Sequence, residues 1–301
     1  MTGAGAASVA WAPETSYLGG TATDPTYREP GSNIQVEDAE LSRNLLEIYA
    51  PNDPETQALL AQNLEGQLSI SWILTNDEFH RLIFNDGNTG FTSGLANSAE
   101  VYLGVDYSSA TTERQLKGWA PASVQIQYNG PTETVRVTVT GAYGDEVKNT
   151  SLTAGTISKT GDEVPGHGAS LTINGVAMTK LQSATLSFEN ISRLQLGPSQ
   201  KPVDAVTGNV STSVDITSIY DGPEQYSLAL GSSGATSVQQ DVGEVSASLT
   251  FDVAGSEVAS YDIAGVAPDT YNWQDLVNPD NDLQESVNFL GHSVTGSDPA
   301  V

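Results

Sequence analysis

The sequence predicts a mainly antiparallel β protein that consists of two similar domains in tandem. Apolar and polar residues alternate along several short segments, which is typical of strands with one buried face. The pattern of segments also recurs after about 145 residues, a period of domain size. At 301 residues the chain is long enough for two domains, each with its own core.

The repeat is visible in two separated stretches of the chain. Residues 39–84 match residues 184–230 in pattern, and the aligned alternating positions are Leu68, Ile70, Trp72 and Leu74 with Val210, Thr212, Val214 and Ile216. Further on, GWAP at 118–121 aligns with GVAP at 265–268, and Val135 and Val137 align with Val287 and Phe289. Because both landmarks keep their order, the repeat favours a duplicated domain over chance similarity between Ser/Thr/Val-rich segments.

The first half begins with a segment of different character. Residues 1–33 are rich in Gly, Pro, Thr and Ala without a sustained period, which predicts an extended arm that orders only against a partner. Residues 34–143 form the first repeat, with strands predicted around 68–74, 124–128 and 135–139.

Two helices are predicted in this repeat. Residues 75–84 suit a helix because Thr75 or Asn76 can cap its start and its apolar residues share one face. A second short helix is predicted at 54–62, with Asp53 as its cap and Pro54 in its first turn.

The second half opens after a predicted linker. Residues 144–168 are rich in Gly, Thr and Ser, and the second repeat covers 169–295. Asn174-Gly175 between apolar residues predicts a tight hairpin. Further strands are expected near 181–195, 208–219, 243–253, 256–264 and 284–294, with a helix near 222–230 capped by Asp221. Residues 296–301 are expected to form a C-terminal tail.

The composition excludes several classes of function. The formal net charge of −26 argues against binding nucleic acid through phosphate contacts and against docking on an anionic membrane. Abundant acids with few lysines are typical of proteins from a salty cytoplasm. The chain has no cysteine, so disulfides and thiol chemistry are excluded. No signal peptide or membrane-length apolar run is visible, so we expect a soluble protein.

The sequence predicts neither an enzyme nor a cofactor. His80, His167 and His292 share no spacing, and no nucleophile elbow, P-loop or dinucleotide glycine pattern is present. One acidic cluster resembles half of a calcium loop, and its weak candidate ligands are Asn278, Asp280, Asp282 and Glu285. It lacks the required glycine and the right distance to the last carboxylate, which favours a solvated loop.

Residues 184–231 resemble the central hairpin of the tail tube proteins of long-tailed, siphovirus-like viruses. The resemblance lies in a strand ATLSFENI, a loop LGPSQKPVDAV, a strand within GNVSTSVDITSIY, and a short helix after Asp221. The first repeat carries the same order more faintly, and neither the arm nor the linker is covered. The acidic composition points to a virus of a halophilic archaeon.

The resemblance implies a structural virion protein. Each domain would be a β-sandwich with a flanking short helix, and domains would close into a ring of sixfold order with a β-barrel around the lumen. Since this chain has two such domains, a homotrimeric ring is expected, with a hexamer as the alternative. Stacked rings would form the tail tube, made in the host cytoplasm and joined by tape measure, terminator and baseplate proteins. Viral DNA would pass through an acidic lumen without specific binding.

The resemblance also implies contact residues. The loops expected to touch the next ring contain Pro51, Asp53, Pro54, Leu59, Leu60, Gly197, Pro198, Lys201 and Pro202. Leu59 and Leu60 either anchor that partner or cover the core of their own domain. The arm would dock on a neighbour through Trp11 and Tyr17. Core positions are expected at Trp72, Phe188, Phe251, Trp273 and Phe289.

Three other functions stay open at this point. A secreted or surface protein of a halophile, with two immunoglobulin-like sandwiches for adhesion, shares the strand content and the acidity. A carbohydrate-active enzyme would need a pocket with paired carboxylates or a metal. A tail terminator or baseplate ring could share the tail tube fold.

Overall fold

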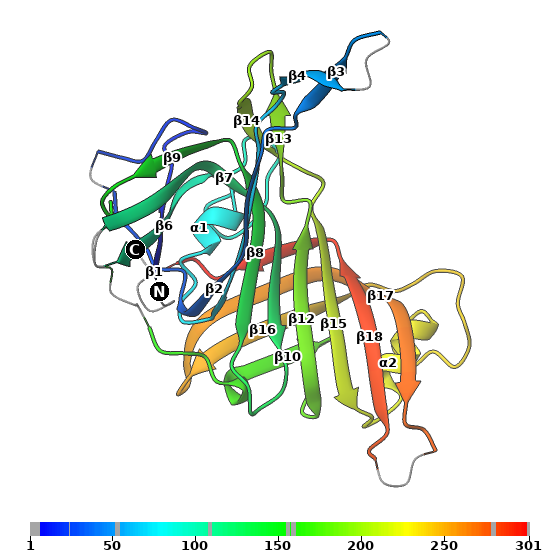
Figure 1. The fold of residues 1–301 in the computed structure, drawn as a ribbon. Helices are drawn as coiled ribbons and strands as arrows, with labels where there is room; N and C mark the ends of the chain where they lie inside the picture. Colours follow the sequence, from blue (N-terminus) through cyan, green and yellow to red (C-terminus); the bar gives the residue numbers. More distant parts are fainter. Residues whose placement is uncertain are drawn as a thin grey trace.

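The computed structural model describes residues 7–23, 25–51, 55–107, 110–154, 157, 161–277 and 281–299. The prediction of a mainly β protein is confirmed, with 58% of residues in strands and 5% in helices. The strands form a layered, sandwich-like architecture around a long central sheet, which Figure 1 shows from its front.

The central sheet contains strands from both halves of the chain. Its order is β17-β18-β15-β12-β7-β8-β5-β2, and every neighbouring pair is antiparallel. The first half supplies β2 (Ser32–Ser42), β5 (Glu65–Ile73), β7 (Ala110–Tyr128) and β8 (Arg136–Tyr143). The second half supplies β12 (Leu181–Glu189), β15 (Ser211–Ile219), β17 (Ser256–Gln274) and β18 (Gln284–Gly291). Thus β7 and β12 join the two halves edge to edge.

Two long strands connect the central sheet to a second layer. β7 and β17 each have 19 residues, and each changes partners at a glycine with positive φ: Gly118 at 68° and Gly265 at 63°. Before Gly118, β7 pairs with β6 (Ala99–Tyr107) and β9 (Asp145–Asn149), and β1 (Ala7–Pro13) pairs with β6. Before Gly265, β17 pairs with β16 (Val245–Val253) and β19 (Ser293–Gly296). β10 (Ala169–Ile173) and β11 (Val176–Ala177) extend that side beyond β16.

Two hairpins project beyond the same end of the central sheet (Figure 1). The first pairs β3 (Leu46–Tyr49) with β4 (Thr56–Leu60), and the second pairs β13 (Ser192–Leu196) with β14 (Pro202–Thr207). The helices are α1 (His80–Ile83), α2 (Glu224–Leu230) and the 3₁₀ turn η2 (Gly166–Gly168).

A single apolar core runs through both halves. Phe84 of the first half contacts Phe188 of the second with ring centroids 6.0 Å apart, and Phe188 in turn lies 6.1 Å from Tyr261. Four of the five predicted core positions are buried: Trp72, Phe188, Phe251 and Phe289. The prediction for Trp273 is wrong, because this side chain is 40% exposed at the edge of the sheet.

The helix predictions are confirmed only in part. Residues 54–62 do not form a helix, because Thr56–Leu60 is the strand β4, held by its ladder to β3; Asp53 and Pro54 lie outside the described residues. The helix predicted at 75–84 is reduced to α1, and Asn76 Oδ1 accepts a hydrogen bond from the Glu78 N–H before it begins. The helix near 222–230 is confirmed as α2, but Asp221 does not cap it and pairs with Lys180 instead.

The described parts of the predicted arm and linker lie within the fold. β1 pairs with β6 along its whole length and Trp11 is buried, so the expectation of an arm that orders only against a partner is wrong for the described part of 1–33. Asp145–Asn149, inside the predicted linker, forms β9. Asn174 and Gly175 have φ of 52° and 75°, which confirms the tight turn of the β10–β11 hairpin.

Candidate functional site

One face of the central sheet is polar across both halves of the chain. Alternate residues of each strand point into the core, and the residues between them form what we call the polar face. Its polar members include Gln67, Ser69, Ser71, Ser123, Gln125, Gln127, Arg136, Thr138, Thr140, Ser183, Thr185, Ser187, Ser213, Asp215, Thr217, Ser286 and Asn288, together with the carboxylates Asp38, Glu40, Glu65 and Glu189. Most carry a neutral hydroxyl or amide group, and most of the charged members are carboxylates.

Hydrogen bonds connect side chains across neighbouring strands of this face. The hydroxyls of Ser69 and Thr140 are 2.8 Å apart, and Asn288 Nδ2 donates to Asp215 Oδ1 at 2.6 Å. Arg136 Nη1 donates to Ser71 Oγ at 3.0 Å at the edge of the face. These hydrogen bonds hold the side chains in fixed positions on the polar face.

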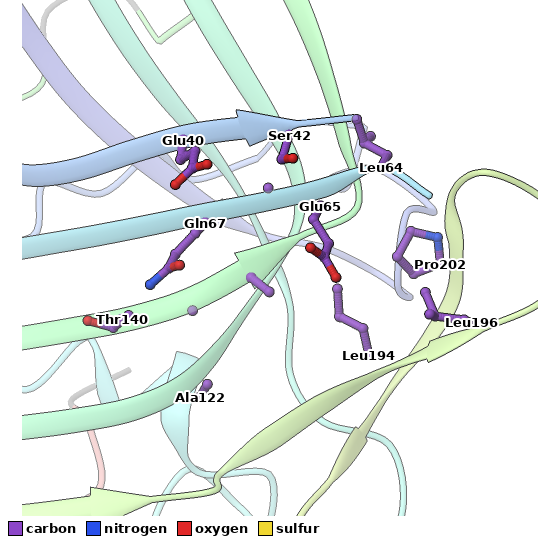
Figure 2. A pocket seen from close by; sticks show the side chains of 13 residues that line it. Glu40, Ser42, Leu64, Glu65, Gln67, Ala122, Thr140, Leu194, Leu196 and Pro202 are labelled. Carbon is purple, nitrogen blue, oxygen red and sulfur yellow. The ribbon is translucent and has the colours of Figure 1, made fainter. Parts of the chain in front are cut away.

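A groove lies where the second hairpin leans over the first half of the sheet (Figure 2). Its volume is about 420 Å³, and Figure 2 shows Glu40, Gln67 and Thr140 on the sheet side and Leu194, Leu196 and Pro202 on the hairpin side. The hairpin is held there by the Leu64 N–H, which donates to the Gln200 carbonyl at 2.8 Å. Lys201 Nζ also lies 2.7 Å from Asp145 Oδ2.

The predicted contact residues divide between the two hairpins. On β4, Leu59 and Leu60 are 61% and 53% exposed, so they do not cover the core of their own domain. Pro51 beside that hairpin and Pro198 on the other are also exposed. Lys201 and Pro202, in contrast, face the first half of the same chain: Pro202 is buried and Lys201 pairs with Asp145. Gly197 packs its backbone against Val203 at the tip.

The Trp11 ring is buried within its own chain and the Tyr17 ring is half-buried there. The Trp11 ring is 2% exposed within β1, and the Arg28 guanidinium lies 5.5 Å from its centroid. The Tyr17 ring packs on the backbone at Gly118 and Gly144, where burial raises the pKa of its phenol. Both aromatic rings therefore stabilise the first half itself.

The predicted cation cluster is not assembled by its described members. Glu285 is buried, and its carboxylate accepts hydrogen bonds from Ser218 Oγ and the Tyr271 hydroxyl, while Asp282 is exposed. Burial raises the pKa of Glu285. Asn278 and Asp280 lie outside the described residues. Across the described ranges, no group of three or more His, Cys, Asp or Glu side chains is placed to hold a metal ion.

The most buried histidine connects the two halves. His80 of α1 lies 2.7 Å from the Tyr261 hydroxyl through Nε2 and 2.8 Å from the Ser297 carbonyl through Nδ1. Burial lowers the pKa of His80 to about 4, so its ring is neutral at pH 7. Its two ring nitrogens therefore connect α1 to β17 and to the segment at Ser297.

Both ends of the central sheet carry exposed apolar groups that sequence reasoning missed. On β2 these are Val36 and Leu41, and beside β17 an aromatic cluster contains Tyr220, Tyr226, Tyr271 and Trp273. The alternation of Tyr271 and Trp273 indicates a strand but gives no sign that the strand has an open edge.

A comparison with known protein-family models finds no match to the chain, and a comparison with curated proteins finds no significant similarity. Within the described ranges, no helix combines the length and the apolar character needed to cross a membrane.

Proposed function

We propose that the chain is the major tail tube subunit of a siphovirus-like virus and that each half is one copy of a tail-tube-type domain. The observation that carries this proposal is the strand order of the central sheet. β2-β5-β8-β7 in the first half is matched by β12-β15-β18-β17 in the second. Apart from β11 and η2, the remaining elements match in the same order: β1 with β10, β3–β4 with β13–β14, α1 with α2, β6 with β16, and β9 with β19.

Details of the ladders support the duplication. Each long strand is irregular just after a proline, Pro121 in β7 and Pro268 in β17, at the same distance from its partner-switching glycine. Counting from these prolines through the paired strands makes Leu68 equivalent to Val214. This is four positions beyond the Val210 that the sequence alignment sets against Leu68.

The way the copies join supports a ring. One copy is added to the other through β7 and β12, and the equivalent strands β17 and β2 end the sheet. Open strand edges are an aggregation hazard, which ring closure removes. Six copies of four strands would give roughly 24 strands, more than the 16–18 that already enclose an aqueous channel. Three chains supply six copies.

The polar face supports a conduit for DNA. If the ring closes with the apolar core on its outer side, the polar face would line the lumen. Its hydroxyl and amide groups would then hold water next to the passing DNA duplex. Firm phosphate binding needs clustered Lys and Arg, whereas the polar face carries Arg136, carboxylates such as Asp215 and Glu189, and many neutral groups. We therefore expect DNA to pass without specific binding.

The hairpins support stacking of rings. Both project at one end of the sheet, and β3–β4 is exposed along its whole length, with Leu59 and Leu60 available to an adjacent ring or to a terminator or baseplate protein. The protein would then be made in the host cytoplasm and reside in the virion tail.

Electron microscopy of the purified chain in molar salt tests the proposal. We expect hollow tubes or stacked rings, because salt screens the repulsion among the acidic subunits. Monomers at every concentration and salt would contradict it and favour the two-sandwich surface protein.

A further inference from the structure

The two ends of the central sheet are complementary to each other. Among the described residues, β2 pairs only with β5, and the part of β17 from Ala267 onward pairs only with β18. Each strand therefore has one open edge along the sheet. Inside the chain, the strands equivalent to these two are paired with each other, as β12 on β7.

The internal junction defines a register. Its ladder places Thr185 opposite Gln127, Leu186 opposite Ile126, Ser187 opposite Gln125 and Phe188 opposite Val124. The ladders that pair each of these strands with its next neighbour identify the equivalent residues at the open edges. For β2, Leu186 pairs with Val214 as Ala39 pairs with Leu68. For β17, Val124 lies three residues after the proline irregularity as Tyr271 does.

We propose that β2 of one chain pairs antiparallel with the C-terminal part of β17 of a second copy, in the register of β12 on β7. The opposed residues are Asp38 with Gln274, Ala39 with Trp273, Glu40 with Asn272, and Leu41 with Tyr271. This inference rests on the duplication in the proposed function and adds the residues through which the copies join.

The side chains fit this register. Leu41 and Trp273, each about two-fifths exposed in the single chain, would be covered together on the core side. On the polar side, the carboxylates of Asp38 and Glu40 would face the amides of Gln274 and Asn272, which can donate to them. In a chain of net charge −26, no like charges then stand directly opposite in this ladder. A slip of one residue would turn Glu40 toward the aromatic core side.

The covering of the two helices points to the same partner. At the internal junction the second half covers α1: Phe188 lies between Phe84 and Phe91, and His80 bonds to Tyr261. Beside α2, the equivalent aromatic cluster with Tyr226 and Trp273 is uncovered. The Phe188 position corresponds to Leu41, so β2 of a second copy would bring Leu41 over this cluster.

Cysteine cross-linking tests the register, since the natural chain has no cysteine. The test variant combines Glu40→Cys with Asn272→Cys, and the oxidised protein is run on a non-reducing gel. We expect covalent dimers and trimers, reversed by reductant, with nothing larger. The matched control combines Ser187→Cys with Gln125→Cys, the equivalent pair inside the chain, and should give only an intramolecular disulfide. Glu40→Cys with Thr270→Cys is displaced by two residues, about 7–8 Å on the diagonal, and should not cross-link.

The outcomes separate this inference from the proposed function. Tubes without a Glu40–Asn272 cross-link, while the internal control forms, would overturn the register and leave the tube subunit standing. Stronger cross-linking of the displaced pair would also overturn it. If every variant stays monomeric and uncross-linked, both proposals fail. Cross-linked trimers without tubes would support the edge pairing and contradict the tube.

Discussion

The junction inside the chain and the two open ends of the chain use elements that we consider equivalent, in very different surroundings. At the junction, Phe188 of β12 is fully buried between aromatic rings of the first half. At the open end, Leu41 of β2 holds the matching ladder position and is 42% exposed. The hairpin β13–β14 rests on the first half through Pro202 and Lys201, whereas every residue of the strands β3 and β4 is exposed.

Under the proposed duplication, the difference teaches that each copy of the domain is completed by a neighbouring copy. At the junction, the strand edges pair with each other, α1 is covered, and the hairpin β13–β14 packs on the first half. At the ends of the chain, the matching strand edges, the aromatic cluster beside α2 and the hairpin β3–β4 are exposed. An isolated edge with exposed apolar groups invites pairing with another chain. On this proposal, the contacts that a single chain lacks at its ends are equivalent to those that it already makes at its junction.

The largest expected effect comes from alanine substitutions at the matching positions Phe188 and Leu41. Phe188→Ala should lower the free energy of unfolding by about 3–5 kcal/mol, since it empties a buried aromatic site. Leu41→Ala should change the free energy of unfolding of the monomer by less than about 1 kcal/mol while reducing assembly. Chemical denaturation measures the first effect and sedimentation the second. Equal losses of stability would show that Leu41 is already part of a closed core.

The next effect concerns the pH dependence of the junction. The pKa of His80 falls from 6.5 to about 4 on folding because the ring is buried. Below pH 6.5 the unfolded chain therefore binds a proton that the folded chain does not. The His80 contribution to stability should decline as the pH falls from about 6.5 to about 4, by up to roughly 3 kcal/mol.

This decline is isolated by comparing variants. Asp77 beside Ser297 has a pKa raised by burial, so it acts in the opposite direction and is present in every variant. His80→Gln should flatten the pH dependence of the unfolding free energy, measured by denaturation between pH 7 and pH 4.5. His292→Gln, at an exposed site, should leave it unchanged. Identical pH profiles for the two variants would show that the burial of His80 does not contribute to the pH dependence of the unfolding free energy.

The strands could be predicted from the sequence because alternation is a local signal. It indicates β5, β8, β12 and β15, and Asn174-Gly175 indicates its hairpin. The register of the repeat could not be fixed this way, since a shift of four residues preserves a period of two. The burial of Trp11 depends on β6, far along the chain, and the strand at Thr56–Leu60 depends on β3. Likewise, the polar face forms only when strands from both halves lie side by side.

A smaller effect separates the two hairpins. Leu59→Ser combined with Leu60→Ser should change the unfolding free energy by less than about 0.5 kcal/mol for each residue, because both side chains are exposed. The variant should form rings that stack poorly, with shorter tubes in electron micrographs. Val238→Ser, which removes an exposed apolar side chain outside the hairpins, is the matched control. Tubes of normal length from the double variant would show that β3–β4 does not hold the stacked rings together.

The smallest effect tests what seats the second hairpin. Lys201 and Asp145 form an ion pair at 2.7 Å, with the lysine side chain 54% exposed. Exposed pairs contribute little, so Lys201→Ala should lower the unfolding free energy by less than about 1 kcal/mol, and molar salt should erase the difference. Pro202 and Ala205 of β14 are buried, and we expect their packing to hold the hairpin. A large, salt-sensitive loss would mean that the ion pair, and not apolar packing, holds β13–β14 against the first half.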